Sequence, residues 1–367
     1  MRLLIVTQKV DERDAVLGFM HGWIDAFSKQ VESVSVVCLE KGRVHLPEKV
    51  SVFSLGKERL KIKDLRFKFG ERFVYAWRFV RYIIQKRNEY DAVLVHMNSE
   101  YIVLGGWFWK LWGKTVTLWY AHKSVTWSVR LAHPFTDIIF TSTKSGFRLP
   151  SNKVRVIGQG IDTEKFNIQY SKFNIQGEAF RIVTVGRISP SKDYETLIDA
   201  IEKVCKEVSV SIKVDIIGPT SVVSDEAYLK RLNERVEKKG LLDVVTFKGP
   251  VANSDLPEVL SGYDLFVNMG HTGSLDKAVP EAMAVGIPVL TCNEAFRDVL
   301  GPFTGDLMYP KGDFSALSDR VQSMVRLGES GRRTLGEQLR AIVVRDHSLE
   351  AFVRKVVSTI ESPTHHD

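Results

Sequence analysis

Two cationic side chains lie in a short loop between a predicted strand and a predicted helix in the second half of the chain. Arg187 and Lys192 belong to the segment VGRISPSKDYETLIDAI, in which a glycine turn follows the strand Ile182–Val185 and a helix begins near Asp193. Cations beside a helix N-terminus bind phosphate through charge-assisted hydrogen bonds and the helix dipole. The spacing therefore indicates a diphosphate site, with two solvated surface cations as the alternative that the pattern leaves open.

A second constellation is the segment HTGSLDKAVPEAMAVGIPVLTC. Its first part, from Gly270 to Lys277, reads as a loop before a helix that has Pro280 in its first turn and Glu281 just behind. Such a loop offers backbone N–H groups to an anion, and Glu281 can accept hydrogen bonds from vicinal sugar hydroxyls. A helix-start carboxylate that only pairs with the helix dipole is the alternative for Glu281.

The elements that must position these residues alternate between short apolar strands and amphipathic helices, the pattern of parallel sheets built from βα units. The predicted strands of the first half are Leu3–Thr7, Ser33–Cys38, Ala92–His96, Val116–Tyr120, Ile138–Thr141 and Val154–Ile157. Those of the second half are Ile182–Val185, Ile212–Ile217, Val244–Phe247, Leu265–Asn268, Val289–Cys292 and Gly305–Tyr309. Each series is long enough for its own doubly wound sheet, so we expect an α/β protein with two Rossmann-like domains.

The domain organisation follows from a polar, turn-rich stretch between the two series. Residues 161–177 read as a connector between an N-terminal domain, residues 1–160, and a C-terminal domain, residues 178–345. Residues 346–361 form an amphipathic helix with Asp346 or Ser348 as its cap.

The cysteine content, the apolar runs and the charge distribution limit the locations and binding partners to be expected. The chain has 367 residues, three scattered cysteines and a formal net charge of +7. No CxxC spacing and no apolar run of about 20 residues occur, so we expect no disulfide framework, no transmembrane segment and a cytoplasmic location. The first 170 residues hold 27 Lys/Arg and 16 Asp/Glu, against 24 and 28 in the remainder. A basic first half suits an anionic membrane or substrate, and no nucleic-acid motif accompanies it, so nucleic acid is not an expected partner.

Together the ordered motifs resemble retaining glycosyltransferases of the group-1 type (glycosyltransferase family 4), which have the GT-B fold. The segments that carry the resemblance are VIGQGIDTEKF, VGRISPSKDYETLIDAI, FKGPV and DLFVNMGHTGSLDKAVPEAMAVGIPVL. The resemblance implies two domains facing across a cleft and a C-terminal helix that crosses back to the first domain.

The same resemblance implies roles for individual residues. Arg187 and Lys192 would hold the donor diphosphate, Glu281 would bind the nucleotide ribose, and the loop through Val251 would touch the base. His122, after TVTLWYA, would lie near the donor sugar and the reaction centre, with a packed strand-end histidine as the alternative. The remaining donor-binding residues expected are Gly18, Gly273, Ser274, Asp276, Lys277 and Ala278.

Two departures from the family pattern bear on the donor. The family often has a glutamate eight residues before Glu281, where this chain has Gly273, and Asp276 is the carboxylate that would compensate. The family also has paired glycines after its first strand, where this chain has Gly18, with Gly22 within the helix that follows.

The implied reaction is transfer of a hexose-type sugar from a nucleoside diphosphate sugar to a hydroxyl of a glycan or lipid-linked acceptor, with retention, in cell-envelope or surface polysaccharide biosynthesis. No DxD pair or acidic cluster stands at the predicted strand ends, so we expect no metal and no other cofactor. The alternatives are a sugar-nucleotide 2-epimerase of the same architecture and an inactive relative that binds nucleotide sugars.

Residues 57–88 are the candidate acceptor-side surface. They mix many cations with aromatic side chains, including Phe73 and Trp77, and such a stretch can lie on an anionic membrane. We expect the protein to be peripheral on the inner face of the plasma membrane through this stretch. An amphipathic helix packed on its own sheet is the alternative. For the aromatic run Trp107–Trp112 we expect burial in the core instead.

Overall fold

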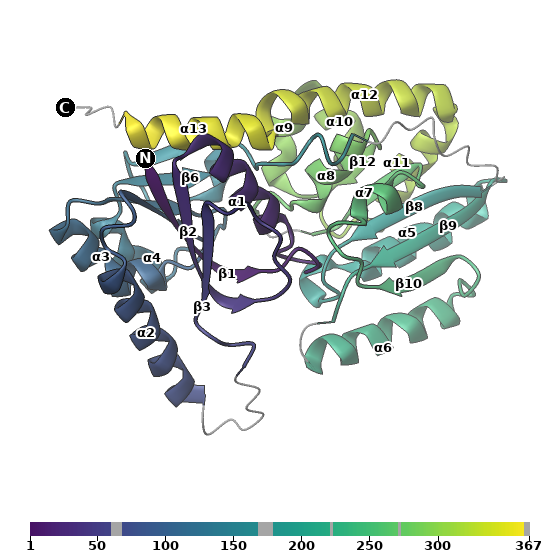
Figure 1. Cartoon of the computed structure of the whole chain (residues 1–367). Helices are drawn as coiled ribbons and strands as arrows, with labels where there is room; N and C mark the ends of the chain where they lie inside the picture. The colour runs from purple at the N-terminus through teal and green to yellow at the C-terminus, as the bar shows by residue number, and fades with distance from the viewer. Residues whose placement is uncertain (60–67, 168–178, 221–222, 271–272, 363–367) are drawn as a thin grey trace. The chain divides into compact units, whose positions relative to one another are not determined.

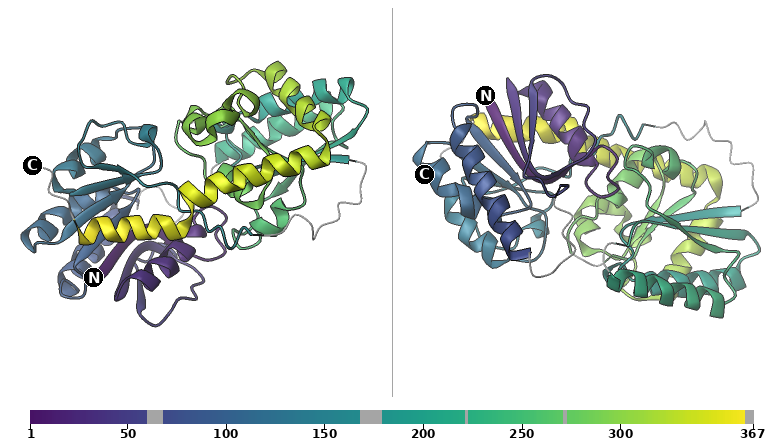
Figure 2. Two further views of the ribbon diagram at one scale, coloured as in Figure 1. Left: turned by 90° about the horizontal axis from the view of Figure 1, so that it is seen from above. Right: turned by 60° about the horizontal axis from the view of Figure 1, so that its bottom comes forward.

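The chain folds into two compact α/β units. The computed structural model describes residues 1–59, 68–167, 179–220, 223–270 and 273–362. One unit is Met1–Gly160 together with the chain from Leu349 onward, and the other is Ile161–Ser348. Figures 1 and 2 show that each unit has one sheet with helices on both of its faces.

The first unit is built on seven parallel strands in the order β3-β2-β1-β4-β5-β6-β7. The strands are β1 (Arg2–Val10), β2 (Ser33–Lys41), β3 (Val50–Ser54), β4 (Ala92–His96), β5 (Thr115–Trp119), β6 (Ile138–Thr141) and β7 (Val154–Val156). The helices are α1 (Phe19–Gln30), α2 (Lys68–Gln85), α3 (Glu100–Leu111), α4 (Trp127–Ala132) and α13 (Leu349–Glu361).

Alternation of side chains along the central strand explains why both faces of this sheet are covered. Leu3 and Ile5 of β1 pack into a core cluster with α1 and α13. Leu4 and Val6 pack into a second cluster with α2, α3 and α4. Successive strand residues point to opposite faces, so an unbroken apolar strand requires a helical layer on each side.

The second unit has five parallel strands in the order β10-β9-β8-β11-β12. They are β8 (Ala179–Val185), β9 (Ser211–Ile217), β10 (Val245–Gly249), β11 (Leu265–Asn268) and β12 (Val289–Thr291). The longer helices are α5 (Tyr194–Glu207), α6 (Val223–Lys238), α8 (Ala278–Val285), α11 (Phe314–Arg326) and α12 (Gly328–His347). The shorter ones include α7 (Leu256–Leu260), α9 (Arg297–Leu300), α10 (Thr304–Leu307) and the turn η5 (Pro190–Lys192).

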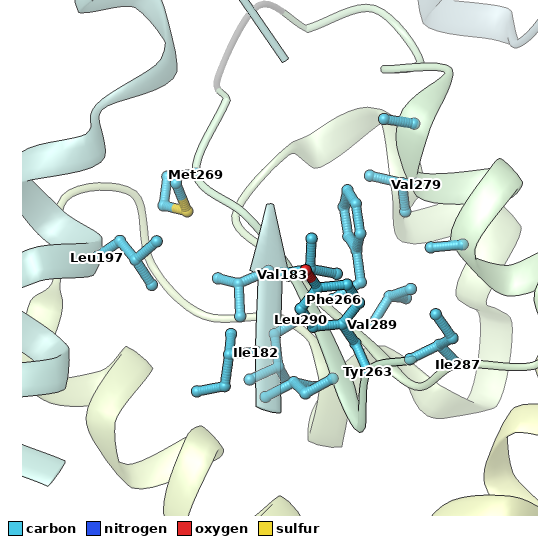
Figure 3. Close-up of a cluster of buried hydrophobic side chains, with 14 of the residues drawn as sticks. Ile182, Val183, Leu197, Tyr263, Phe266, Met269, Val279, Ile287, Val289 and Leu290 are labelled. Carbon is cyan, nitrogen blue, oxygen red and sulfur yellow. The ribbon is translucent and has the colours of Figure 1, made fainter. Parts of the chain in front are cut away.

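A single buried cluster joins this sheet to its helices. Figure 3 shows Ile182 of β8, Phe266 of β11 and Leu290 of β12 beside Val279 from α8 and Leu197 from α5. Burying each large apolar side chain contributes about 1.5–3 kcal/mol. The cluster therefore fixes the starts of α5 and α8 against the sheet, and both starts carry predicted site residues.

The expected GT-B-type architecture of two Rossmann-like units with a returning C-terminal helix is present. Helix α13 belongs to the first unit and packs against α1, where Phe352 lies on the Trp23 ring with centroids 4.2 Å apart (Figure 1). This helix begins at Leu349, because Asp346 still lies in α12 and Ser348 is the single residue between the two helices. Of the expected connector 161–177, residues 161–167 pack with the second unit and the rest lie outside the described residues.

Three expectations about elements were wrong. Strand β3 was not predicted, because its sequence VSVFS is short and its burial alternates at the sheet edge. Residues Gly305–Tyr309 are not a strand: Thr304–Leu307 is a helical turn, and Met308 makes only an isolated bridge to Thr291. Within Trp107–Trp112 only Trp109 is fully buried, whereas the Trp107 side chain is 70% exposed.

Candidate active site

The loops at the carboxyl edge of the second sheet approach one another so closely that glycine is required. Gly218 follows β9 with a φ of +155°, and a Cβ atom there would lie 1.9 Å from the carbonyl oxygen of Gly186, which follows β8. Ligands of open parallel sheets bind outside this edge. The close approach leaves backbone groups of two adjacent strand ends side by side there.

The loop after β8 carries the two predicted phosphate-binding cations. Lys192 ends the turn η5, Asp193 takes a left-handed conformation with a φ of 51°, and α5 starts at Tyr194. The Tyr194 hydroxyl donates to the carbonyl oxygen of Gly186 at 3.0 Å and so ties the helix start to the strand end. The Arg187 side chain is exposed and makes no ion pair with a described residue, so its guanidinium is available to a ligand.

Lys192 is held by a chain of polar side chains that crosses the edge of the sheet. Its Nζ donates to Asp276 Oδ2, and the same oxygen accepts from Asn268 Nδ2 at 2.9 Å. Asn268 ends β11 and accepts in turn from Thr291 Oγ1 of β12 at 3.0 Å. The structure thus brings together two predicted residues, Lys192 and Asp276, and adds Asn268, which sequence reasoning missed. Its signal was a polar residue at the end of the apolar run DLFVN.

The segment from Gly273 to Ala278 is a compact loop that leads into α8. Gly273 has a φ of +68°, a backbone conformation in which a side chain is strained. The carbonyl oxygen of Ser274 accepts from Asn293 Nδ2 at 2.8 Å, which anchors the loop to the segment after β12. Helix α8 begins at Ala278 and ends at Val285, and its C-cap Gly286 has a φ of +93°. The loop is therefore fixed at both of its described ends.

Glu281 lies in the first turn of α8 and is almost completely buried. Its carboxylate is hydrogen-bonded to the side chain of Asn253, and Lys165 Nζ donates to Asn253 Oδ1 at 2.9 Å. Burial raises the pKa of Glu281 and lowers the pKa of its neighbour Lys277, while the opposite charges of the two side chains counteract both shifts. The two groups titrate as a pair. Lys165 and Asn253 are further residues that the sequence did not single out.

Val251 follows β10 in the same unit and is half-buried against its core. The strand ends at Gly249, with a φ of +73° after a register irregularity between Phe247 and Gly249. This turn leads through Val251 to Asn253, the residue beside Glu281. The predicted base-contacting loop and the predicted ribose-binding carboxylate are therefore connected.

His122 belongs to the first unit, just beyond the end of β5. Its backbone N–H donates to the carbonyl oxygen of Gly146 at 2.8 Å, and its Nδ1 accepts from the backbone N–H of Ser124 at 3.1 Å. Burial, aided by Lys123, lowers the pKa of His122 below its ordinary value. At neutral pH the ring is therefore uncharged, and the acceptor role of Nδ1 leaves the proton on Nε2.

Gly18 and His96 lie near the carboxyl edge of the first sheet. Gly18 is buried at the start of α1, where its N–H donates to the carbonyl oxygen of Asp14 at 3.0 Å. His96 ends β4 and packs edge-on against Phe19 and Trp23 at 5.8 Å from each ring centroid. His96 is therefore part of a packed aromatic cluster at this strand end.

The predicted residues therefore fall into two sets, one in each unit. Those of the second unit gather at one edge of its sheet, whereas Gly18 and His122 belong to the first. Among the described residues, no three His, Cys, Asp or Glu side chains lie close enough together to hold a metal ion. None of the helices described is both long enough and apolar enough to cross a bilayer.

Comparison with known proteins gives a family match within the second unit. Residues 165–341 match the model of glycosyl transferases group 1. Those residues include every predicted site residue of the second unit. The second unit is thus similar to the group 1 glycosyl transferases.

Curated relatives match over part of their length. Mannosylfructose-phosphate synthase of Agrobacterium fabrum is 28% identical over 153 residues, which are 39% of this chain and 33% of the relative. Alpha-monoglucosyldiacylglycerol synthase of Streptococcus pneumoniae is 26% identical over 214 residues, 55% of this chain and 45% of the relative. The matched part of the chain spans less than half the length of each of these relatives.

Solved structures match over the whole chain. HepE of Anabaena, in complex with UDP-glucose, superimposes with a TM-score of 0.77 at 16% identity, covering 98% of this chain and 99% of that one. Sucrose-phosphate synthase of Thermosynechococcus elongatus gives a TM-score of 0.76 at 16% identity, covering 98% of each. At this identity the likeness establishes the GT-B fold.

Proposed function

We propose that the protein is a retaining glycosyltransferase that moves a hexose-type sugar from a nucleoside diphosphate sugar to a hydroxyl of a glycan or lipid-linked acceptor in cell-envelope or surface polysaccharide biosynthesis. The observation that carries the proposal is the loop after β8, in which Arg187 is exposed beside Lys192 at the start of α5. The loop adjoins the turn at Gly186 where two strand ends meet.

In this proposal Arg187 and Lys192 neutralise the negative charge that develops on the departing diphosphate. Charge stabilisation of this kind is usually the largest single contribution to catalysis of such a step. Lys192 exchanges its bond to Asp276 for a phosphate oxygen, and the backbone from Gly273 to Ala278 donates further hydrogen bonds. Glu281 accepts from the ribose hydroxyls, supported by Asn253.

The acceptor hydroxyl attacks from the face of the leaving phosphate, which takes the proton, so that the configuration at the anomeric carbon is retained. His122 contributes its Nε2–H to the donor sugar, because its Nδ1 is already an acceptor. Asp276 offers its carboxylate to the sugar hydroxyls once Lys192 has moved to the phosphate. Gly273 stands where the family pattern has its first glutamate. In the loop from Gly273 to Ala278, the carboxylate is that of Asp276.

A screen of nucleotides tests the donor site. We expect UDP, GDP or ADP to raise the melting temperature, because a ligand at a hundred times its Kd stabilises by about 2.7 kcal/mol. Arg187→Glu should abolish the shift, and Arg297→Glu, on α9 of the same unit, should keep it. An unchanged shift in Arg187→Glu would contradict the phosphate assignment.

A sugar-nucleotide assay with and without acceptor separates transfer from its alternatives. Release of nucleoside diphosphate together with a glycosylated product supports the proposal. Conversion of the donor to an isomeric sugar nucleotide without acceptor would identify an epimerase. Binding without either reaction over a broad acceptor panel would identify an inactive relative. We further propose that turnover needs no metal, and full activity in EDTA is the expected result.

We also propose that the first unit rests on an anionic membrane from the cytoplasmic side. On α2 the side chains of Phe73 and Trp77 are exposed, and the neighbouring helices α3 and α4 add Trp107 and Trp127. Exposed aromatic side chains beside cations are typical of surfaces that lie at lipid headgroups. In flotation with vesicles of anionic phospholipid at low salt, Trp107→Ser should lower the bound fraction. Leu242→Ser, an exposed position of the second unit, is the control.

A further inference from the structure

A separate cavity lies in the first unit, outside every element that carries the donor residues. It has a volume of about 810 Å³ and is enclosed by the end of β2, the edge strand β3 with its following turn, and helix α2. Lys41 ends β2 and Ser54 ends β3, so the cavity opens at the carboxyl edge of the sheet. Ligands of open parallel sheets bind at this edge.

One wall of this cavity is aromatic. Phe53 of β3 and Tyr82 of α2 are stacked, with ring centroids 4.6 Å apart and planes inclined by 26°. Trp77 of α2 also lines the cavity, with 59% of its side chain exposed. Flat, rigid rings of this kind pack against the apolar face of a sugar ring or against an acyl or prenyl chain.

The rest of the cavity lining is mainly positively charged. Four cations line the cavity, namely Lys41, Arg59, Arg78 and Arg81, against one carboxylate, Glu58. That carboxylate already accepts from Ser54 Oγ at 2.7 Å. Among the described residues, Lys41, Arg78 and Arg81 have no carboxylate within ion-pair distance. Among the described lining residues, positive charge therefore exceeds negative charge.

Two of the arginines are positioned by contacts to groups other than carboxylates. Arg78 Nη1 donates to the carbonyl oxygen of Leu55 at 2.6 Å, and the Arg81 guanidinium lies over the Trp77 ring at 5.2 Å. The turn is shaped around Arg78, because Gly56 has a φ of +95° and a Cβ atom there would lie 2.3 Å from Arg78 Nη1. A guanidinium positioned in this way keeps several N–H donors for an anion.

We propose that this cavity binds a phosphate ester of the acceptor, with the phosphate on the cations and the attached sugar or hydrocarbon on the aromatic wall. Arg side chains bind phosphate through paired hydrogen bonds, and the rings supply contact area for the neutral part. The inference rests on the proposed function, since it names the chemical class of the acceptor. The same phosphate could belong to a soluble sugar phosphate or to a lipid-linked one.

Direct binding tests the proposal without the donor. The probes are glucose 1-phosphate, geranyl phosphate and, as the uncharged control, methyl glucoside, titrated by calorimetry. We expect at least one phosphate probe to bind and methyl glucoside not to bind. The double variant Lys41→Gln/Arg81→Gln should raise the Kd at least tenfold. Arg72→Gln, on the same helix but outside the cavity lining, should leave the Kd unchanged.

The outcomes separate this site from the donor site and from a membrane surface. Binding of glucose 1-phosphate alone identifies a soluble acceptor, and binding of geranyl phosphate identifies a lipid-linked one. No binding of either probe at millimolar concentration, or equal binding by the double variant, overturns the proposal. Equal losses of vesicle binding in the double variant and in Arg72→Gln, without an effect on the soluble probes, would also overturn it. Nucleotide-induced thermal shifts should persist in both variants, and their absence in the wild-type protein would instead refute the proposed donor site.

Discussion

At the proposed donor site, Lys192 and Asp276 form an ion pair in the ligand-free protein. Both side chains are mostly buried, with 18% and 14% exposed, and Asn268 donates to the same carboxylate oxygen. Lys192 is thus neutralised by a carboxylate from the neighbouring loop. If Lys192 binds the donor diphosphate as proposed, we expect the diphosphate to compete with Asp276 for the ammonium group, so that Asp276 opposes nucleotide binding while it keeps the lysine ordered.

Replacing Asp276 by Asn tests this competition. We expect Asp276→Asn to bind UDP, or whichever nucleotide the wild-type protein binds, several-fold more tightly, because Lys192 no longer gives up a counter-ion. The ligand-free variant should lose about 1–3 kcal/mol of stability, since a partly buried cation is left without its partner. Calorimetry and urea unfolding measure the two effects.

Asp306→Asn, at an exposed position of α10, is the matched control and should change neither quantity. Weaker nucleotide binding by Asp276→Asn would contradict the competition. A sugar nucleotide that gains less affinity than the free nucleotide would support the contact between Asp276 and the donor sugar.

At the scale of elements, the sequence predicted the buried strands and missed features set by long-range packing. Strands such as Leu265–Asn268 are short apolar runs, as expected for strands of a parallel sheet that is buried on both faces. Their positions could therefore be predicted from the sequence. Strand β3 pairs only with β2 at the sheet edge, and its half-exposed residues carry no comparable signal. Trp107 and Trp109 are two residues apart on α3, so they point to different faces, and a run of aromatics cannot tell which face is buried.

Some residues of the candidate site could likewise be predicted from the sequence, and others could not. Glu281, Arg187 and Lys192 stand in recognisable segments after predicted strands. Asn268 and Asn253 became visible only when strands distant in sequence were placed side by side. A polar residue at a strand end gains meaning from its neighbour across the sheet, and the register that brings Asn268 to Thr291 is a property of the fold.

The turn at Gly218 provides a prediction about how elements meet. Gly218→Ala should destabilise the protein by several kcal/mol, because the new Cβ atom would lie 1.9 Å from the Gly186 carbonyl oxygen and the φ of +155° disfavours a side chain. If the variant folds, its nucleotide-induced thermal shift should be lost, since the turn beside Arg187 is displaced. Gly305→Ala, where a Cβ atom meets no other atom within 4 Å, is the control. Equal stability of the two variants would contradict the close approach.

The start of β1 is joined to the segment before β4 by an ion pair that should act on acid stability. Arg2 donates to the Asp91 carboxylate from its backbone N–H and from its guanidinium, whose Nη2 lies 2.7 Å from Oδ1. These hydrogen bonds lower the pKa of Asp91 to about 2. The unfolded carboxyl has a pKa of about 3.9. The pair therefore stabilises the fold above about pH 4, and the contribution is lost as the pH falls toward 2.

Urea unfolding of Asp91→Asn between pH 6 and pH 3 measures this contribution. The difference in stability between wild type and variant should be largest at pH 6 and should shrink as the pH falls below 4. Glu234→Gln, at an exposed position of α6, should run parallel to the wild type. A difference that does not vary with pH would show that Asp91 acts through its shape and hydrogen bonds alone.

At the scale of the whole molecule, the chain crosses between the units twice, and the crossings lie beside each other. The first is Gly160–Ile161 and the second is Ser348–Leu349. Ile161 N–H donates to the carbonyl oxygen of His347 at 2.7 Å, and Ile161 forms an isolated parallel bridge with Ser348. On the other side, Trp23 Nε1 donates to the carbonyl oxygen of Gly160 at 2.8 Å. At the first crossing, Gly160 is therefore hydrogen-bonded within the first unit and Ile161 within the second.

We expect the backbone at these two crossings to allow rotation of one unit relative to the other. Because the proposed donor residues and His122 belong to different units, we expect a bound nucleotide sugar to draw the units together by a hinge movement. Small-angle scattering should give a smaller radius of gyration with the nucleotide that shifts the melting temperature. The Arg187→Glu variant should give the same profile with and without nucleotide. Superimposable profiles for the wild-type protein under saturating nucleotide would show that the donor site works without a change in the arrangement of the two units.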